Sequence, residues 1–118
     1  MMWNVPQTVT VTAFTEPFDV QSCSRMRSAF REHVRNGKYV HVVDLRQLEA
    51  TDALVLKAII IAVRTVREAG GRLCVVVDNP NVRRALSLTA LDRVFPVHAN
   101  LEEAYAALDY AMCFEKRA

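Results

Sequence analysis

Short apolar runs alternate with helical stripes along almost the whole chain of 118 residues, and this alternation strongly limits its fold. The run "RLCVVVD" at 72–78 is nearly uninterrupted, which is typical of a central strand covered on both faces. "YVHVVDL" at 39–45 predicts a second strand, and "VFPVH" at 94–98 predicts a short one whose proline favours an edge. "QTVTVTAF" at 7–14 alternates valine with threonine, which predicts a strand with one side in water.

Helical periodicity fills the intervals between these runs. Residues 20–35 carry apolar side chains at steps of three and four, and Asp19 before them is a favoured N-cap. The longest helix is expected over about 52–69, where Gly70 and Gly71 supply the left-handed turn that ends it. The stripe of the first helix consists of Val20, Cys23, Met26, Phe30 and Val34.

Two further helices complete the pattern. Asn79 followed by Pro80 predicts an N-cap and a first helical position, for a short helix that ends near Leu88. Asn100 with Glu103 is similar to a capping box at the start of a last helix. The apolar stripe of that helix is expected to be Leu101, Tyr105, Leu108 and Met112.

The resulting order is β-α-β-α-β-α-β-α, which favours a sheet with helices packed on it. Right-handed helical crossovers make the connected strands parallel. We therefore predict a single α/β domain over 1–118, with a core from about 8 to 114. About four helices would pack on a mixed, mostly parallel sheet of four to five strands.

The totals exclude several classes of protein. The formal net charge of +2 is too small to indicate a nucleic-acid-binding protein. The apolar run 58–63 is far too short to cross a bilayer, and the first ten residues lack the charged and apolar regions of a signal peptide. Cys23, Cys74 and Cys113 are widely spaced within apolar runs, which favours buried free thiols in a reducing compartment. We expect a cytoplasmic protein without membrane insertion or nucleic-acid partners.

The chain also lacks the usual catalytic and cofactor motifs. There is no phosphate-binding GxxxxGK[ST] loop, no GxGxxG turn and no GxSxG elbow. His33, His41 and His98 lie in separate elements and are not spaced as metal ligands. We therefore expect neither an enzyme nor a bound cofactor or metal. A small enzyme or nucleotide-binding domain is the alternative from another class, and a thermal shift with ATP, GTP and Mg²⁺ would test it.

Four stretches, in order and at the right spacing, resemble the STAS domain of bacterial anti-sigma factor antagonists. The likeness extends from about Thr8 to Leu108 and favours the STAS-like fold. Its segments are "TEPFDVQSCSRMRSAF", "VHVVDLRQLEATDALVLKAI", "REAGGRLCVVVDNPNVRRAL" and "ALDRVFPVHANLEEAYAAL".

The resemblance implies a phosphorylation loop, and this sequence departs from it. Such proteins usually read Asp-Ser-[Ser/Thr]-Gly-Leu here, and a partner kinase that is also the anti-sigma factor phosphorylates the second hydroxyl residue. With Asp52 matched to the aspartate and Leu56 to the leucine, the residues between are Ala53, Leu54 and Val55. Leu54 stands at the acceptor position and has no hydroxyl, so it cannot carry the negative charge of a phosphate.

Three polar residues of this region have open roles. Thr51 could substitute as acceptor, but either it or Asp52 could simply cap the helix that follows. By resemblance, Asp19 contributes to an acidic patch near the loop, although as an N-cap it would be structural. Asp44 ends a strand and is expected to hold the loop by hydrogen bonds.

The expected long helix also has an unusual polar side. A wheel at 100° per residue groups Lys57, Arg64 and Glu68, with Ile61 in the middle and Leu54 and Ile60 flanking it. An apolar strip within a solvent face predicts a protein that covers it. The last helix or a second copy of the chain could also do so, and Ile61 could be a single harmlessly exposed residue.

We therefore expect a protein-interaction module that resembles an anti-sigma factor antagonist. It would bind a kinase-like anti-sigma factor, or another regulatory protein, without phosphorylation at the usual position. The sequence does not decide between a monomer and a homodimer. The alternative is a non-phosphorylated STAS subunit of a stress-signalling or lipid-transport assembly. The partner surface would comprise Thr51, Asp52, Ala53, Leu54, Val55, Lys57, Ile60, Ile61 and Arg64.

Overall fold

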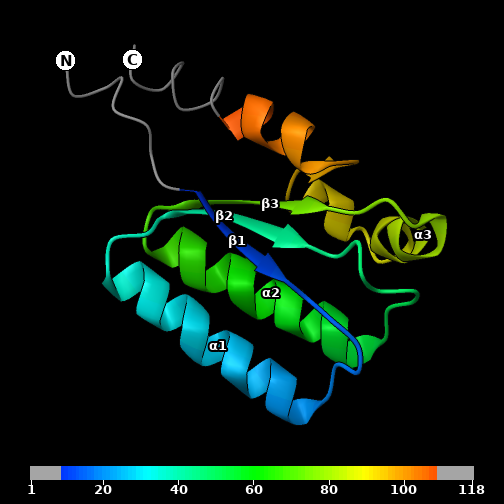
Figure 1. Ribbon diagram of the computed structural model, residues 1–118, viewed down its shortest axis with the longest axis horizontal. Helices are drawn as coiled ribbons and strands as arrows, with labels where there is room; N and C mark the ends of the chain where they lie inside the picture. Colours follow the sequence, from blue (N-terminus) through cyan, green and yellow to red (C-terminus); the bar gives the residue numbers. More distant parts are fainter. Residues whose placement is uncertain (1–8, 109–118) are drawn as a thin grey trace.

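The computed structural model describes residues 9–108, which form a parallel four-stranded sheet with strand order β1-β2-β3-β4 (Figure 1). The predicted α/β class is confirmed, and within the described residues no antiparallel or fifth strand accompanies these four. The strand predicted over 94–98 is shorter, since β4 begins only after Pro96, and it lies at an edge of the sheet as the proline predicts. The strands are β1 (Val9–Ala13), β2 (Val40–Asp44), β3 (Arg72–Val76) and β4 (Val97–His98).

Helices cover both faces of the sheet. The first three are α1 (Val20–Arg35), α2 (Ala53–Glu68) and α3 (Pro80–Leu88), followed by the short 3-10 helix η2 (Leu91–Arg93) and a helical segment at 101–108. In Figure 1, α1 and α2 lie on one side of the sheet and the segment 101–108 (orange) on the other. Each side has its own hydrophobic core, because strand side chains alternate between the faces.

The predicted helix caps are present as side-chain hydrogen bonds. Asp19 accepts a hydrogen bond from the Ser22 amide at 2.8 Å, and Asn79 accepts one from the Asn81 amide at 2.8 Å. Gly70 ends α2 with a φ of +81°, the left-handed conformation that favours glycine. Gly71 starts the approach to β3, where a Cβ atom would come within 2.3 Å of the Tyr39 carbonyl oxygen.

The two faces of β1 are the reverse of those that its alternating sequence suggests. Thr10 and Thr12 pair with His41 and Val43 of β2, so they point to the face that α1 and α2 cover. Val11 lies on the opposite, more open face and is exposed. The strand does have one side in water, but a valine rather than the threonines lies on it.

Two positions of the predicted helix stripes are wrong. Val20, the first residue of α1, is 73% exposed. Tyr105 is also exposed, while Ala104 and Leu108 are buried against the second core. Met112 lies outside the described residues, as do both ends of the predicted core.

The thiols of Cys23 and Cys74 are buried and unpaired, as predicted. Burial raises the pKa of Cys74 to about 11, so its thiol is protonated at neutral pH. Cys113 lies outside the described residues. No helix within residues 9–108 is long and apolar enough to span a bilayer.

Candidate functional site

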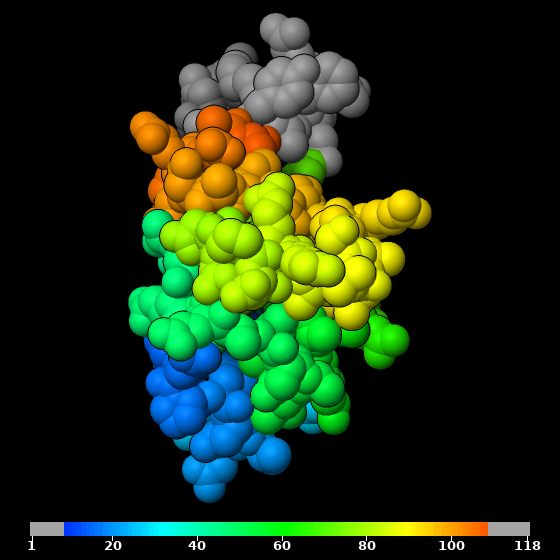
Figure 2. All heavy atoms as spheres, turned by 90° about the vertical axis from the view of Figure 1, so that its right-hand side faces the viewer, coloured from blue at the N-terminus to red at the C-terminus, as the bar shows by residue number. Residues whose placement is uncertain are grey.

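Two loops at the carboxyl end of the sheet enclose an open pocket of about 460 Å³. One loop joins β1 to α1 and the other joins β2 to α2, and Figure 2 shows these segments (blue and green) side by side. The pocket forms here because parallel strands end at the same edge of a sheet. Its lining residues are Glu16, Pro17, Phe18, Leu48, Ala50, Asp52 and Val55.

Asp44 holds the start of the β2–α2 loop, as the sequence predicts. Its buried carboxylate accepts hydrogen bonds from the Arg46 amide at 3.0 Å and from the Arg46 guanidinium at 2.9 and 2.8 Å. These side-chain hydrogen bonds lower the pKa of Asp44 below its ordinary value, against the opposing effect of burial. The charge of Asp44 is therefore paired within the loop.

A second hydrogen bond fastens the middle of the same loop. The Asn79 side-chain amide donates to the Glu49 carbonyl at 3.2 Å, which ties the loop to the start of α3. Together with the pair of Asp44 and Arg46, this contact fixes the path that leads to Thr51 and α2. Neither Arg46 nor Asn79 was predicted to shape this loop; the "DLR" spacing at 44–46 was the available signal for Arg46.

Asp52, rather than Thr51, caps the long helix. Its carboxylate accepts a hydrogen bond from the Val55 amide at 3.0 Å. Thr51 is half-buried, and among residues 9–108 its hydroxyl donates only to the Asp52 carbonyl, at 3.4 Å. Asp52 therefore has the capping role, and Thr51 does not.

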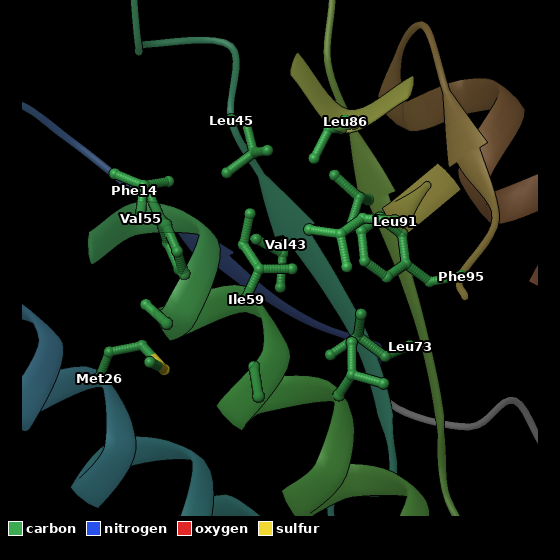
Figure 3. Packing of buried hydrophobic residues seen from close by; sticks show 14 of the residues in the cluster. Phe14, Met26, Val43, Leu45, Val55, Ile59, Leu73, Leu86, Leu91 and Phe95 are labelled. Carbon is green, nitrogen blue, oxygen red and sulfur yellow. The ribbon is translucent and has the colours of Figure 1, made fainter. Parts of the chain in front are cut away.

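Leu54 occupies the second position of α2, next to the cap. Its side chain is half-buried and packs partly against the main core. The flanking Ala53 is exposed, whereas Val55 is almost fully buried and lies near Phe14 in Figure 3. The position that the family gives to glycine is therefore a core position in this chain.

The predicted apolar strip on the outer face of α2 is smaller than the helical wheel indicates. Ile61 is half-buried and packs against the main core, as does Leu54. Lys57, Ile60 and Arg64 are exposed, with Ile60 at 40%. The wheel misplaces Ile61 because it cannot locate α1, which packs against α2. The segment 101–108 does not cover this face, since it lies on the other side of the sheet.

Asp19 lies one residue after Phe18, which lines the pocket. Its carboxylate is exposed and caps α1, and the hydrogen bond from the Ser22 amide lowers the pKa of Asp19 below its ordinary value. The carboxylates that line the pocket itself are Glu16 and Asp52.

The lining of this pocket does not suit a phosphate group. No lysine or arginine of residues 9–108 lines the pocket, and its two carboxylates would repel a nucleotide phosphate. Within residues 9–108, no three or more of the His, Cys, Asp and Glu side chains are grouped to hold a metal ion. The pocket instead offers an apolar interior of Phe18, Leu48 and Val55 beneath an acidic rim.

Comparisons with known proteins match the sheet and its helices. The crystal structure of an anti-sigma factor antagonist from Mycobacterium paratuberculosis gives a TM-score of 0.72 at 26% identity and covers 84% of both chains. SpoIIAA of Bacillus, an anti-sigma factor antagonist in its unphosphorylated form, gives a TM-score of 0.73. That match covers 89% of this chain and 91% of SpoIIAA at 17% identity, so it shows the fold alone.

Sequence comparison gives the same family. A Thermotoga maritima protein named as a candidate anti-sigma factor antagonist is 31% identical over 75 residues, which is 64% of this chain. The alignment spans 66% of that relative, slightly less than two thirds of its length. The profile of the STAS domain matches residues 1–104. The predicted resemblance is confirmed, and the chain belongs to the STAS domain family.

Proposed function

We propose that this protein is an anti-sigma factor antagonist that binds a kinase-like anti-sigma factor and thereby releases a sigma factor. The names of its relatives support this role. The proposed contact surface is the loop surface, defined as Thr51, Asp52, Ala53, Leu54, Lys57, Ile60, Ile61 and Arg64. Val55 was also predicted there, but it is buried in the core and is left out. Binding would be independent of phosphorylation at the usual position.

The observation that carries the proposal is the placement of Leu54. It lies in the first turn of α2, at the edge of a surface whose loop is fastened by Asp44 and Asn79. A fastened loop loses little conformational freedom when a partner binds. Leu54 has no hydroxyl, so a kinase cannot add charge at that position. Position 54 therefore never carries a phosphate.

Val55, the residue after Leu54, is a second departure from the family loop. Val55 contributes to the main core, so a return to the family's glycine would remove apolar packing. Leu54 and Val55 therefore differ from the family loop in two separable ways. One removes the phosphate acceptor, and the other builds the helix start into the core.

The proposal is tested by replacing Leu54→Glu and purifying the tagged protein from its own host. A carboxylate in the first turn is favourable to the helix, so the variant should remain folded. We expect wild type to retain a kinase-like protein and Leu54→Glu to lose it. Leu88→Glu is the matched control, because Leu88 is 76% exposed on α3 and lies outside the loop surface.

Three results would contradict parts of this proposal. Retention of the partner by Leu54→Glu would exclude Leu54 from the contact surface. A scaffold or transport ATPase in place of a kinase-like protein would favour the alternative role as a subunit of a larger assembly. Phosphate on Thr51 in the mass spectra would show that the acceptor has moved rather than disappeared.

A further inference from the structure

A second hollow lies beside the C-terminal half of α2, where this helix meets the segment after η2. Val63 and Phe95, both almost fully buried, form its floor, and Phe95 points toward the main core in Figure 3. Ile60 and Val94 form its walls and are each 40% exposed. We call this hollow, with Arg64, Arg67 and Glu68 at its rim, the α2–η2 groove.

The size of the groove points to a protein side chain as its occupant. Its volume of about 220 Å³ is smaller than the roughly 300 Å³ at which small-molecule pockets usually begin. Two exposed aliphatic walls above an apolar floor form a continuous surface that gains stability when an apolar group covers it. An aliphatic side chain of a partner protein would meet these conditions.

The rim adds a preference for a negative charge. The Arg67 guanidinium donates a hydrogen bond to the Val94 carbonyl, which joins α2 to the opposite wall and keeps a positive charge there. The Arg64 side chain is exposed and makes no hydrogen bond or ion pair with any residue in 9–108, and the same holds for the Glu68 side chain. Two guanidinium groups against one carboxylate favour an acidic occupant, and Arg64 has all its donors available.

The groove is continuous with the loop surface, because Ile60 and Arg64 belong to both. We infer that the partner protein places an aliphatic side chain in the α2–η2 groove and an adjacent carboxylate against Arg64. The identity of this partner rests on the proposed function, whereas the chemistry of the groove does not. The loop surface would then provide the part of the interface that a charge at Leu54 disrupts, and the groove a second anchor.

Synthetic peptides test the chemistry directly on the full chain. The first peptide contains leucine and glutamate, the second has lysine in place of each glutamate, and the third has serine in place of each leucine. We expect the first peptide alone to shift the amide NMR signals of residues 60–68 and 93–95. Equal shifts with the lysine peptide, or shifts confined to other residues, would overturn the inference.

Variants of the wall and rim sharpen the test. Arg64→Glu should lower the affinity for the glutamate peptide by about fivefold, which is the most that one exposed ion pair contributes. The same variant should bind the lysine peptide more tightly. Arg31→Glu is the control for charge, since Arg31 is exposed on α1. Ile60→Ser should abolish the shifts, and Leu88→Ser should not. Unchanged peptide affinity in Arg64→Glu and Ile60→Ser would overturn the assignment of the groove.

Binding of the natural partner separates this inference from the proposed function. If Leu54→Glu loses the partner while Arg64→Glu and Ile60→Ser keep it at wild-type affinity, the proposed function holds and the groove is not part of the interface. Partner loss in all three variants, with Arg31→Glu unaffected, supports both. If the groove variants convert a dimer of this chain to monomer without changing partner affinity, the occupant is a second copy and the inference is wrong.

Discussion

The two ends of α2 present opposite chemistry. At its start, the pocket between the loops is wide, open and rimmed by the carboxylates of Glu16 and Asp52. Along its second half, the α2–η2 groove is half that volume or less, mainly aliphatic, and rimmed by Arg64 and Arg67. A single rigid helix therefore carries an acidic contact region and a basic one at a fixed separation. A partner with the complementary order of charges can bind in one direction only.

The two ends also differ in how they are held. The start depends on polar contacts, namely the Asp52 cap and the pair of Asp44 and Arg46. The second half depends on apolar packing around Phe95. Packing terms are the larger of the two in folded proteins, so mutations at the two ends should differ in size and in their dependence on pH.

The largest effect is expected at the floor of the groove. Phe95→Ala removes a buried ring from the main core and should lower the free energy of unfolding by about 3 to 5 kcal/mol. Urea denaturation followed by circular dichroism measures this. Val94→Ala is the control, because the side chain of Val94, the residue before Phe95, is 40% exposed. Similar losses in the two variants would mean that Phe95 does not anchor this end of the helix.

A smaller effect is expected at the helix start. Asp52→Ala removes the cap of the Val55 amide and should cost about 1 kcal/mol of stability. Asp92→Ala, an exposed carboxylate in η2 beside the groove, should cost much less. Hydrogen exchange would locate the loss: the amide of Val55 should exchange faster in Asp52→Ala, while β3 stays protected. Unchanged exchange at Val55 would show that the cap contributes little.

These expectations show how far the sequence defines the molecule. The caps and ends of α1, α2 and α3 follow from local residues such as Asp19, Asp52 and Asn79, because a cap acts within its own turn. The face of a helix that meets solvent does not follow locally. Ile61 packs against the main core, and α2 packs against α1, but a helical wheel contains no information about the rest of the core or the neighbouring helix.

At the candidate site too, local features could be predicted from the sequence and features that depend on distant segments could not. Asp44, Asp52 and Leu54 were predicted from the loop sequence, which is continuous, and their part in binding stays a prediction. The groove was missed because Val94 and Phe95 were expected in a strand and lie far along the chain from Ile60. The inward side of β1 was missed as well, since threonine suits either face of a strand and only pairing with β2 decides between them.

Acid should weaken the loop end more than the groove end. The Arg46 guanidinium keeps the pKa of Asp44 below its ordinary value of 3.8 in the folded protein. The unfolded chain therefore binds the proton more readily, and the stabilisation present at neutral pH is lost as the pH falls below about 4. The effect should be modest, because the Arg46 side chain is 35% exposed and water screens the pair.

Thermal unfolding between pH 7 and pH 2.5 would show this dependence. Asp44→Asn cannot titrate at this position, so its stability should fall less steeply with acid than that of the wild type. Arg64→Gln is the control at the groove, where Arg64 makes no ion pair with a described residue. Parallel acid profiles for the wild type and Asp44→Asn would rule out a contribution from this carboxylate.

The smallest effect on stability is expected at the groove wall. Ile60→Ser changes a partly exposed side chain and should alter the free energy of unfolding by no more than about 0.5 kcal/mol. Urea denaturation provides the measurement, with Ile59→Ser as the buried neighbour that should be strongly destabilised. A large loss in Ile60→Ser would mean that this wall supports the fold and is unsuitable as a test of binding.

The strand order β1-β2-β3-β4 has a consequence for how the protein is made. Each strand pairs with the one synthesised just before it, so every helix and strand that leaves the ribosome can dock on a finished neighbour. Within residues 9–108, no strand pairs with one that lies beyond its immediate neighbour in the chain order. Such a chain can add its strands in the order of synthesis. Until the next strand arrives, the newest one is an exposed edge that can pair with another chain.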